Sequence, residues 1–359
     1  MPAGSISLVF FILLFALGCN RAQAAEFYTD ADLFWYSEPV SIESMIQDWG
    51  GPFYGGTTAL THNIAEIGFG TESWQFSVLT RYDYEMEFSP DTAEFYYLMR
   101  NELPLPVGRT YRLDLVARQT VSDGLRVARQ FRVAKGFDVN VGLSYLKGRR
   151  LTDGTLRGNA TAIGAKDYDY SFLVDYFYSE DKLFDRPVSS PSGDGYSIDL
   201  GAQWQLEERL RATVTLKDFL ARILWHDAPY TIATGTSDVK TYDANGYVVY
   251  DPLVSGFEGN RDFIQTLPRR GTMRIDYDWN THLRLSGIVD YTPPRTFYRL
   301  GVGALQTKYG EWSLLYYLNE GAVNVGFSAP AWSIALTTDS TDINRARTLG
   351  LVARYAMTY

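Results

Sequence analysis

The sequence is poor in cysteine, and beyond its first residues it has no long apolar run. Cys19 is the only cysteine among 359 residues, so no disulfide can form within one chain. Beyond residues 1–24, no stretch reaches the roughly 18 consecutive apolar residues that a membrane-spanning helix needs. Cross-links and spanning helices are therefore excluded from the mature chain, and its fold must be held by packing and backbone hydrogen bonds.

Catalytic signals are also scarce. His62, His226 and His282 are the only histidines that could serve as a base near neutral pH. The sequence has no Gly-x-Ser-x-Gly motif, no metal-ligand spacing, and no phosphate-loop or dinucleotide motif. We therefore expect no cofactor, no metal and no enzymatic activity, with an outer-membrane hydrolase as a distant alternative. The formal net charge of −9 argues against nucleic acid or anionic lipid as a general partner.

Aromatic residues, in contrast, are abundant. The chain has 26 Tyr, 20 Phe and 8 Trp, yet its mean hydropathy is only −0.17. This combination is typical of a transmembrane β-barrel, in which half of each strand faces lipid, half faces water and aromatic girdles mark both interfaces.

Residues 1–24 have the pattern of a signal peptide. Leu8–Leu17 is the apolar segment, and Ala22-Gln23-Ala24 matches a small-x-small cleavage site. In an alternative interpretation, Ala16-Leu17-Gly18-Cys19 is a lipobox, and Cys19 becomes the lipidated first residue of the mature protein.

Residues 350–359 alternate strictly. One face of this segment is formed by every second residue, namely Leu351, Ala353, Tyr355, Met357 and Tyr359. A period of two is the period of a strand, whose successive side chains point to opposite faces.

The same alternation continues through most of residues 60–359, and it is clearest in residues 73–87. There Trp74, Phe76 and Val78 begin an apolar face, whereas Arg81 and Asp83 lie on the other. A charge at mid-bilayer costs roughly 2–4 kcal/mol in a barrel, so the polar face must line a lumen. We count about 16 antiparallel strands, with 14 to 18 as the range.

The terminal segment resembles the closing strand of Gram-negative outer-membrane β-barrels. This resemblance implies an outer-membrane location, contact with outer-membrane lipid and lipopolysaccharide, and recognition by the barrel-assembly machinery through Tyr355, Met357 and Tyr359. It implies short periplasmic turns and long extracellular loops, and it leaves oligomerisation possible. No particular family is recognised.

Two regions depart from simple alternation. Residues 25–59 are interrupted by Pro39 and by Gly50-Gly51-Pro52, and residues 41–49 could form a short helix. We interpret them as a periplasmic segment, a plug or an ordered lead-in to the first strand. Residues 218–269 are interpreted as a long extracellular loop, or as a loop that folds inward to form a constriction. Within them, Asp243-Ala244-Asn245-Gly246 precedes a β-prone run and predicts the tight turn of a hairpin.

Lumen-facing charges are the candidate site. Arg112 and Arg118 lie on one predicted strand, and Arg126 and Arg132 on the next, so that acids across the lumen could create a selecting field. Further candidates for the lumen are Arg209, Arg211, Arg274, Arg284, Asp276 and Asp278. Candidates in the outer loop are Trp225, His226 and Asp227.

The sequence supports two functional hypotheses. The first is a porin-like channel for a small hydrophilic, perhaps anionic, solute. The second is a non-conducting barrel that serves envelope assembly, or the export or attachment of a surface polysaccharide. The identity of the solute or glycan is open at this level.

Overall fold

The computed structural model is a closed antiparallel β-barrel, described for residues 25–183, 185–237, 240–242, 248–250, 253–304 and 310–358. Its wall is a ring of 14 strands. The ring closes where β18 pairs with β1 along the whole length of β1. Because no backbone group on an open edge can be satisfied in lipid, closure is what lets a sheet cross a membrane.

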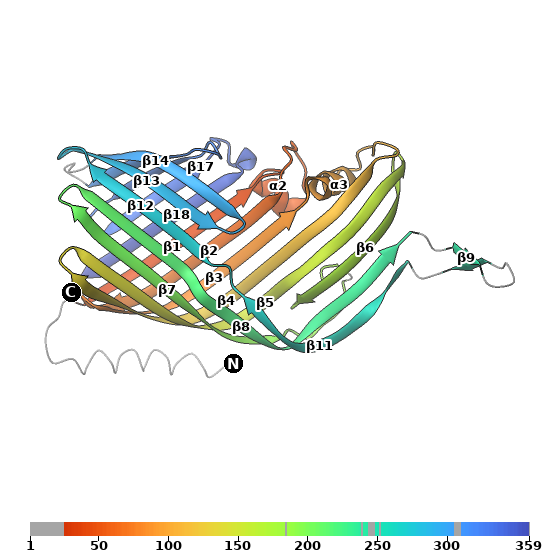
Figure 1. Ribbon diagram of the computed structural model, residues 1–359, viewed down its shortest axis with the longest axis horizontal. Coiled ribbons are helices and arrows are strands. Elements are labelled where there is room, and N and C mark those ends of the chain that lie inside the picture. Colours follow the sequence, from red (N-terminus) through yellow and green to blue (C-terminus); the bar gives the residue numbers. More distant parts are fainter. Residues whose placement is uncertain are drawn as a thin grey trace.

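The ring strands follow one another in space nearly as they do in sequence (Figure 1). They are β1 (Glu26–Ser37), β2 (Thr58–Gly70), β3 (Trp74–Phe88), β4 (Thr110–Ala134), β5 (Phe137–Gly164), β7 (Ser192–Glu207), β8 (Leu210–Thr236), β12 (Arg270–Asp278), β13 (Leu283–Thr292), β14 (Arg295–Ala304), β15 (Glu311–Tyr317), β16 (Val323–Ser328), β17 (Trp332–Thr338) and β18 (Thr348–Thr358).

The remaining elements lie outside this ring. They are β6 (Asp167–Tyr178), β9 (Lys240–Tyr242), β10 (Val248–Tyr250), β11 (Val254–Thr266), α2 (Ile42–Gln47), α3 (Pro90–Arg100) and a 3-10 turn (Ile343–Arg345). The expected number of strands, about 16 with a range of 14 to 18, is therefore met at its lower limit.

The two rims of the barrel differ. Glu26 pairs with Thr358, so the start of β1 and the end of β18 share a rim. The connections after β7, β12 and β16 lie at this same rim and are short. In Figure 1 they lie at the left end, whereas α2, α3 and β9 lie toward the right. By the asymmetry usual in such barrels, we call the rim with the short turns the periplasmic rim and the rim with the longer excursions the extracellular rim.

The wall is much taller on one side than on the other. β4, β5 and β8 have 25, 28 and 27 residues, whereas β15, β16 and β17 have 7, 6 and 7. About 9–11 residues suffice to cross the hydrocarbon core, so the long strands continue beyond the membrane. In this extension β6 pairs with β5 and β8 above β7, and β11 pairs with β8 above β12.

The lipid-facing alternation is confirmed on the short wall. Its outward residues are half exposed, and they include Leu300, Trp312, Leu314, Tyr316 and Leu336. On the tall wall the prediction fails above the membrane. Tyr111 and Leu113, expected to face lipid, are buried beneath Phe95 and Leu98 of α3. Protein takes the place of lipid there because the sheet has left the bilayer.

Residues 25–59 do not form the expected periplasmic segment or plug. Residues 26–37 are wall strand β1, which pairs with β2 and β18. The predicted helix exists as α2, capped by Ser41, whose hydroxyl accepts a hydrogen bond from the Ser44 amide. It follows β1, however, and so lies at the extracellular rim. None of the helices in the described ranges is long and apolar enough to cross a membrane.

Residues 218–269 are also not the simple loop that was expected. Most of them continue β8 upward and return as β11, and β9 and β10 form the predicted hairpin at the tip. The predicted turn of this hairpin, residues 243–246, lies outside the described residues. Where β11 passes into β12, Gln265 and Leu267 join the buried packing around Trp225.

The barrel interior contains one tightly fitted indole. Trp225 is fully buried, and a Cβ atom added at Gly148 would lie 2.5 Å from its ring. We expect Gly148→Ala to destabilise the barrel by about 1–3 kcal/mol because the ring has no free space to move into. Gly201→Ala, where the added Cβ meets its nearest neighbour at 3.4 Å, is the matched control and should be nearly neutral. Urea unfolding in lipid vesicles measures both, and equal effects would contradict the prediction.

Candidate functional site

A cluster of charged side chains fills the middle of the lumen. It consists of His62 from β2, Arg81 and Asp83 from β3, Asp218 from β8, and Arg270 at the start of β12. All five are buried, and Asp218 is only 1% exposed. Two arginines face two aspartates, so the cluster is neutral apart from the imidazole.

Direct ion pairs hold this cluster together. The guanidinium of Arg81 donates two hydrogen bonds to the carboxylate of Asp218, at 2.8 and 2.9 Å. Arg270 donates to Asp218 at 2.8 Å and to Asp83 at 3.2 Å. The Arg81 Nε–H donates to Asp83 at 2.7 Å, and the His62 Nδ1 lies 2.9 Å from the same carboxylate. Each charge therefore has an opposite charge beside it, as burial requires.

A β-bulge brings Asp218 into the lumen. Where β8 pairs with β7, the register passes from Leu216 opposite Leu200 to Leu220 opposite Ile198. Three residues of β8 thus face one residue of β7. Asp218 has a φ of +56°, and its amide donates to Asp199 at 2.9 Å. A non-glycine residue with this φ costs of order 1 kcal/mol or more, so the ion pairs must hold the bulge in place.

The pairs cross the lumen. Arg81 and Asp218 lie on β3 and β8, which are separated in the ring by β4, β5 and β7. Next to them, the Lys217 ammonium lies 3.1 Å from the Asp32 carboxylate, joining β8 to β1 almost across the barrel. These bridges divide the lumen at mid-height.

Separate cavities remain around the bridges. On the periplasmic side a cavity of about 310 Å³ is lined by Asp30, Glu66, Arg126 and Asp199. On the extracellular side a cavity of about 30 Å³ lies between Gln265 and Pro293. A third cavity, of about 220 Å³, lies against the short wall.

Apolar side chains fill the lumen of the tall wall just outside the charged cluster. Trp225, Ile223, Leu146, Leu151 and Leu267 are each at most 1% exposed. The indole Nε1–H of Trp225 donates to the Gln265 side chain at 3.1 Å, so its polar atom is satisfied. This packing covers the extracellular side of the ion pairs and excludes water from it.

Above this apolar packing, the inner face of the extension carries aromatic side chains. Phe177 of β6 stacks on Phe263 of β11, with 4.0 Å between ring centroids. The Arg261 guanidinium lies 4.8 Å from the Phe177 ring centroid and 4.3 Å from that of Tyr230. Phe257 is next to Tyr230 and is 63% exposed. We call these five residues the aromatic face.

The predicted arginine ladder does not form one constriction. At about 3.3 Å per residue, residues 112–132 of a single strand cover roughly 65 Å, and all four arginines lie on β4. Each has its own acid. The nitrogen–oxygen distances are 3.6 Å for Arg112–Asp114, 3.0 Å for Arg118–Glu85, 3.2 Å for Arg126–Glu66 and 3.4 Å for Arg132–Asp138.

The other lumen candidates form pairs near the periplasmic rim. Arg274 pairs with Asp276 at 2.8 Å, and Arg284 pairs with Asp278 at 2.6 Å. Arg211 donates to the Gln205 side chain at 3.1 Å, and the carbonyl of Arg209 accepts from the Asp278 amide at 2.9 Å. These residues pair within one strand or with the neighbouring strand, and they do not meet at one site.

The three outer-loop candidates lie on opposite sides of the wall. Trp225 lies inside the barrel, whereas His226 and Asp227 are exposed on its outer wall. The His226 Nδ1 is 3.5 Å from Asp262, and the Asp227 amide donates to the same carboxylate. Tyr355 and Met357 lie on β18, 43% and 37% exposed, while Tyr359, Cys19 and residues 1–24 lie outside the described residues.

The sequence contained one signal for the missed cluster. Leu210, Ala212, Val214 and Leu216 alternate toward lipid, and Asp218 falls on the same register. A carboxylate cannot face lipid at that depth without a large cost, so a bulge is required. Its partners, Arg81 and Arg270, could not be found in this way because they lie far away in sequence.

A further polar cavity, separate from the three in the lumen and of about 310 Å³, lies at the extracellular rim of the short wall. In it the Glu320 carboxylate is 1% exposed and lies 3.6 Å from the Arg295 guanidinium. Neither of its oxygens accepts a hydrogen bond from the described residues. Burial raises the pKa of Glu320 above its usual range, and Arg295 only partly offsets this effect.

No protein-family model matches the chain, and no curated protein matches it. Its closed antiparallel wall with apolar outer residues is that of a membrane-spanning β-barrel. Among solved structures it is similar to a TodX deltaS2S3 mutant monoaromatic hydrocarbon channel, with 8% identity, 94% and 91% of the two chains covered, and a TM-score of 0.44.

Two further structures give the same kind of match. The toluene transporter TbuX of Ralstonia pickettii has 10% identity, coverage of 94% and 90%, and a TM-score of 0.30. A Pseudomonas aeruginosa FadL homologue has 11% identity, coverage of 94% and 89%, and a TM-score of 0.35. Because these TM-scores are low, no residue role is transferred from those proteins to this barrel.

The cluster should depend for its stability on the carboxylate of Asp218, which lies at the bulge. Asp218→Ala leaves Arg81 and Arg270 facing each other without their shared acid, so we expect a loss of about 3–5 kcal/mol of unfolding free energy. The double variant Arg81→Ala/Asp218→Ala keeps the cluster neutral and should lose less than the sum of its single variants. Urea unfolding of the four proteins in vesicles completes the cycle, and additive losses would contradict this account.

The buried carboxylate of Glu320 at the rim predicts that the stability of the barrel depends on pH. A raised pKa in the folded state means that Glu320 favours folding while it is protonated, below its ordinary pKa of about 4.3, and that this contribution is lost as pH rises through the raised value. We expect the unfolding midpoint of Glu320→Gln to exceed that of the wild type at pH 7.5 and to approach it at pH 4. A constant difference across this range would sink the prediction.

Proposed function

We propose that this protein is a gated outer-membrane channel that admits small apolar, particularly aromatic, molecules from the extracellular side. The observation that carries the proposal is the aromatic face, with its exposed ring Phe257, above a lumen divided by ion pairs. A molecule that entered from outside would meet Phe257, Tyr230 and Phe177 before it met the charged cluster.

The lumen charges argue against the hydrophilic, anion-selective porin that the sequence suggested. A selecting field needs basic side chains that are free to attract a passing anion. In this barrel Arg126 is shared between Glu66 and Asp199, at 3.2 Å each, and Arg81 is saturated by Asp83 and Asp218. Pairing of this kind cancels the field, so polarity alone provides no filter for anions.

The aromatic face supports an apolar ligand. Rings offer large, rigid contact areas, and offset or edge contacts between aromatic rings add about 0.5–1.5 kcal/mol beyond the area that they bury. Phe257 leaves most of its surface open to such a contact. A bound ring would then lie over the buried Trp225 packing, on the path toward the cluster.

The charged cluster is the gate in this proposal. Because breaking one partner of a buried pair costs several kcal/mol, the closed state is the stable one without a ligand. A ligand opens it only to the extent that it binds the open state more tightly. The bulge at Asp218 holds the backbone at a strained positive φ, and the ion pairs that keep it there are the contacts that opening would break.

The alternative, a non-conducting barrel for envelope assembly or for polysaccharide export or attachment, is favoured by one observation. The lumen is divided at mid-height by side chains that are buried and fully paired. An aromatic face with an arginine also suits the apolar faces of sugar rings. The two proposals differ in whether the gate ever opens.

Planar-bilayer conductance distinguishes the two proposals. The wild type should show rare openings, and Arg81→Ala/Asp218→Ala should raise the open probability at least severalfold because both cross-lumen partners are gone. Arg132→Ala/Asp138→Ala, a pair at the periplasmic rim, is the matched control and should behave as the wild type does. A folded double variant that never conducts would refute the channel and leave the assembly barrel.

Substrate class is tested separately in proteoliposomes. Phe257→Ser should reduce naphthalene entry several-fold, since an exposed contact worth about 1 kcal/mol is lost. Phe219→Ser, on the outer wall and 38% exposed, is the control and should leave entry unchanged. If glucose enters faster than naphthalene, and Phe257→Ser changes neither rate, the apolar assignment is wrong.

A further inference from the structure

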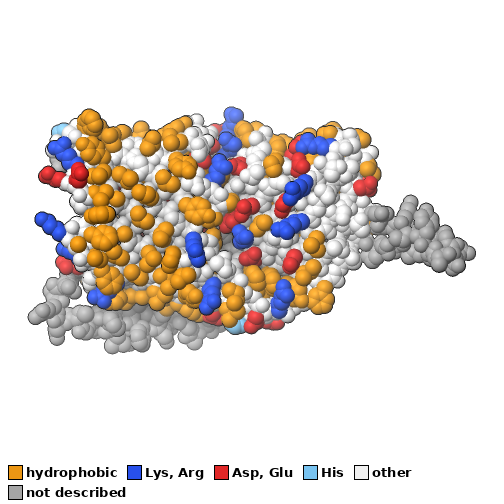
Figure 2. Space-filling view, in the orientation of Figure 1, with side chains coloured by type: hydrophobic (Ala, Val, Ile, Leu, Met, Phe, Trp, Pro, Cys, Tyr) orange, Lys and Arg blue, Asp and Glu red, His pale blue; other side chains and the backbone are white. Residues whose placement is uncertain are grey.

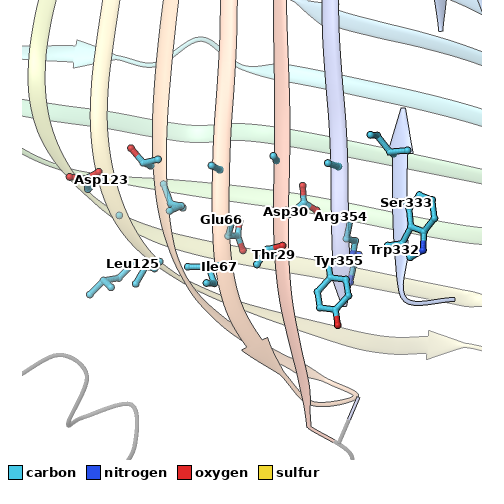
Figure 3. A pocket seen from close by; sticks show the side chains of 18 of the residues that line it. Thr29, Asp30, Glu66, Ile67, Asp123, Leu125, Trp332, Ser333, Arg354 and Tyr355 are labelled. Atoms are coloured by element: carbon cyan, nitrogen blue, oxygen red, sulfur yellow. The ribbon is translucent and has the colours of Figure 1, made fainter. Parts of the chain in front are cut away.

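The outer wall of the barrel has a groove of about 970 Å³. In Figure 3, Leu125, Ile67, Thr29, Tyr355 and Trp332 follow one another across five strands. The strand registers place them in one continuous row, which runs from Trp332 on β17 to Leu125 on β4 and then to Tyr145 on β5.

Small side chains form the floor of this groove. The adjacent register row contains Ala353, Ala31, Ala65 and Thr80, in that spatial order. Six strand steps of about 4.8 Å give the groove a length of roughly 29 Å. Trp332 and Tyr355 lie at its periplasmic end and Tyr145 at its extracellular end, as expected of residues at the two membrane interfaces. The groove therefore lies in the lipid-facing zone.

Basic side chains gather at the extracellular end of the groove. Lys147 follows Tyr145 on β5, and Arg149 reaches back across the wall to Asp123 at 2.6 Å. Arg150 is exposed and pairs in register with Val121 on the outer face. Figure 2 shows Lys and Arg side chains to the right of the apolar band, which is the extracellular side.

The basic band continues around the tall wall. Arg222 lies in the same register row as Tyr145, and its guanidinium is 5.3 Å from the Tyr196 ring centroid. Arg269 lies 5.8 Å from the Phe219 ring centroid. Asp123 and Asp194 neutralise Arg149 and Lys147. Within the described residues, Arg150, Arg222 and Arg269 form no ion pair, so these three charges are available to a ligand.

We propose that this surface is a binding site for lipopolysaccharide, with acyl chains of its lipid A in the groove and lipid A phosphates on the basic band. Both parts of the ligand are needed to explain the surface. A groove of small side chains in the hydrocarbon zone fits acyl chains, and unpaired arginines just above an aromatic row fit phosphate groups. The site does not depend on whether the barrel conducts.

The position of the charge identifies the leaflet. The band is at the extracellular end of the groove, and the outer leaflet is where a Gram-negative membrane carries this phosphorylated glycolipid. A second copy of the chain fits less well, because it would bring the same basic band against itself at a two-fold contact. A neutral lipid would leave the arginines without a partner.

Native mass spectrometry of the full barrel, extracted from outer membranes in mild detergent, tests the site with lipid A as the ligand detected. Arg150→Ser/Arg222→Ser should lower the retained lipid A roughly 30-fold, since each basic residue near a membrane surface contributes a factor of about five. Arg129→Ser/Lys135→Ser removes two exposed basic residues near the periplasmic rim and should retain as much as the wild type.

A second pair of variants tests the groove. Ala65→Phe fills its floor and should also lower retention, whereas Ala212→Phe, outward-facing on β8 and away from the groove, should not. Heat-modifiable mobility on gels confirms that each variant is folded. Adding back lipid A, or its dephosphorylated form, to delipidated barrels should restore binding only with the phosphates present.

Three outcomes would overturn the proposal. The site is wrong if neither Arg150→Ser/Arg222→Ser nor Ala65→Phe loses lipid A. The assignment of the head group is wrong if the groove variant alone loses it, or if dephosphorylated lipid A binds equally well. The choice of lipid is wrong if the retained species is a phospholipid.

Discussion

The structure depends on one constraint, namely that a sheet in lipid has no water to satisfy its edges. The pairing of β1 with β18 over residues 26–36 removes the last open edge, and everything else follows from that closure. Once the ring is closed, alternation forces one set of side chains outward into lipid and the other into the lumen. The lumen set is polar, and in this narrow space its charges must find partners inside the protein.

The charged cluster is where that requirement becomes specific. A regular β8 would place Asp218 in lipid, and the bulge places it between two arginines instead. The strain of the bulge and the desolvation of the charges are both offset by the same ion pairs. The ion pairs that satisfy the carboxylate are therefore the same contacts that bridge the lumen.

The same part of the wall carries a feature on each of its sides. On the lumen side Lys217 holds Asp32 and Arg81 holds Asp218, while on the outer side Ala31, Ala65 and Thr80 line the groove. The overall charge of −9 does not reveal this arrangement. Acidic side chains form ion pairs in the lumen, whereas Arg150, Arg222 and Arg269 lie unpaired on the outer wall.

The sequence by itself determined the class of fold, the outward faces of the short strands and the position of the rims, because a period of two is a local property of adjacent residues. The helix at 42–47 and the hairpin tip were also local and were found. It did not determine the ring size, since β6 with β7 and β11 with β12 each share one wall position. Nor did it reveal that the apolar residues 111 and 113 meet a helix, or that residues 81, 218 and 270 meet in the lumen. Those contacts join strands far apart in sequence, and only closure of the barrel decides which side chains then face each other.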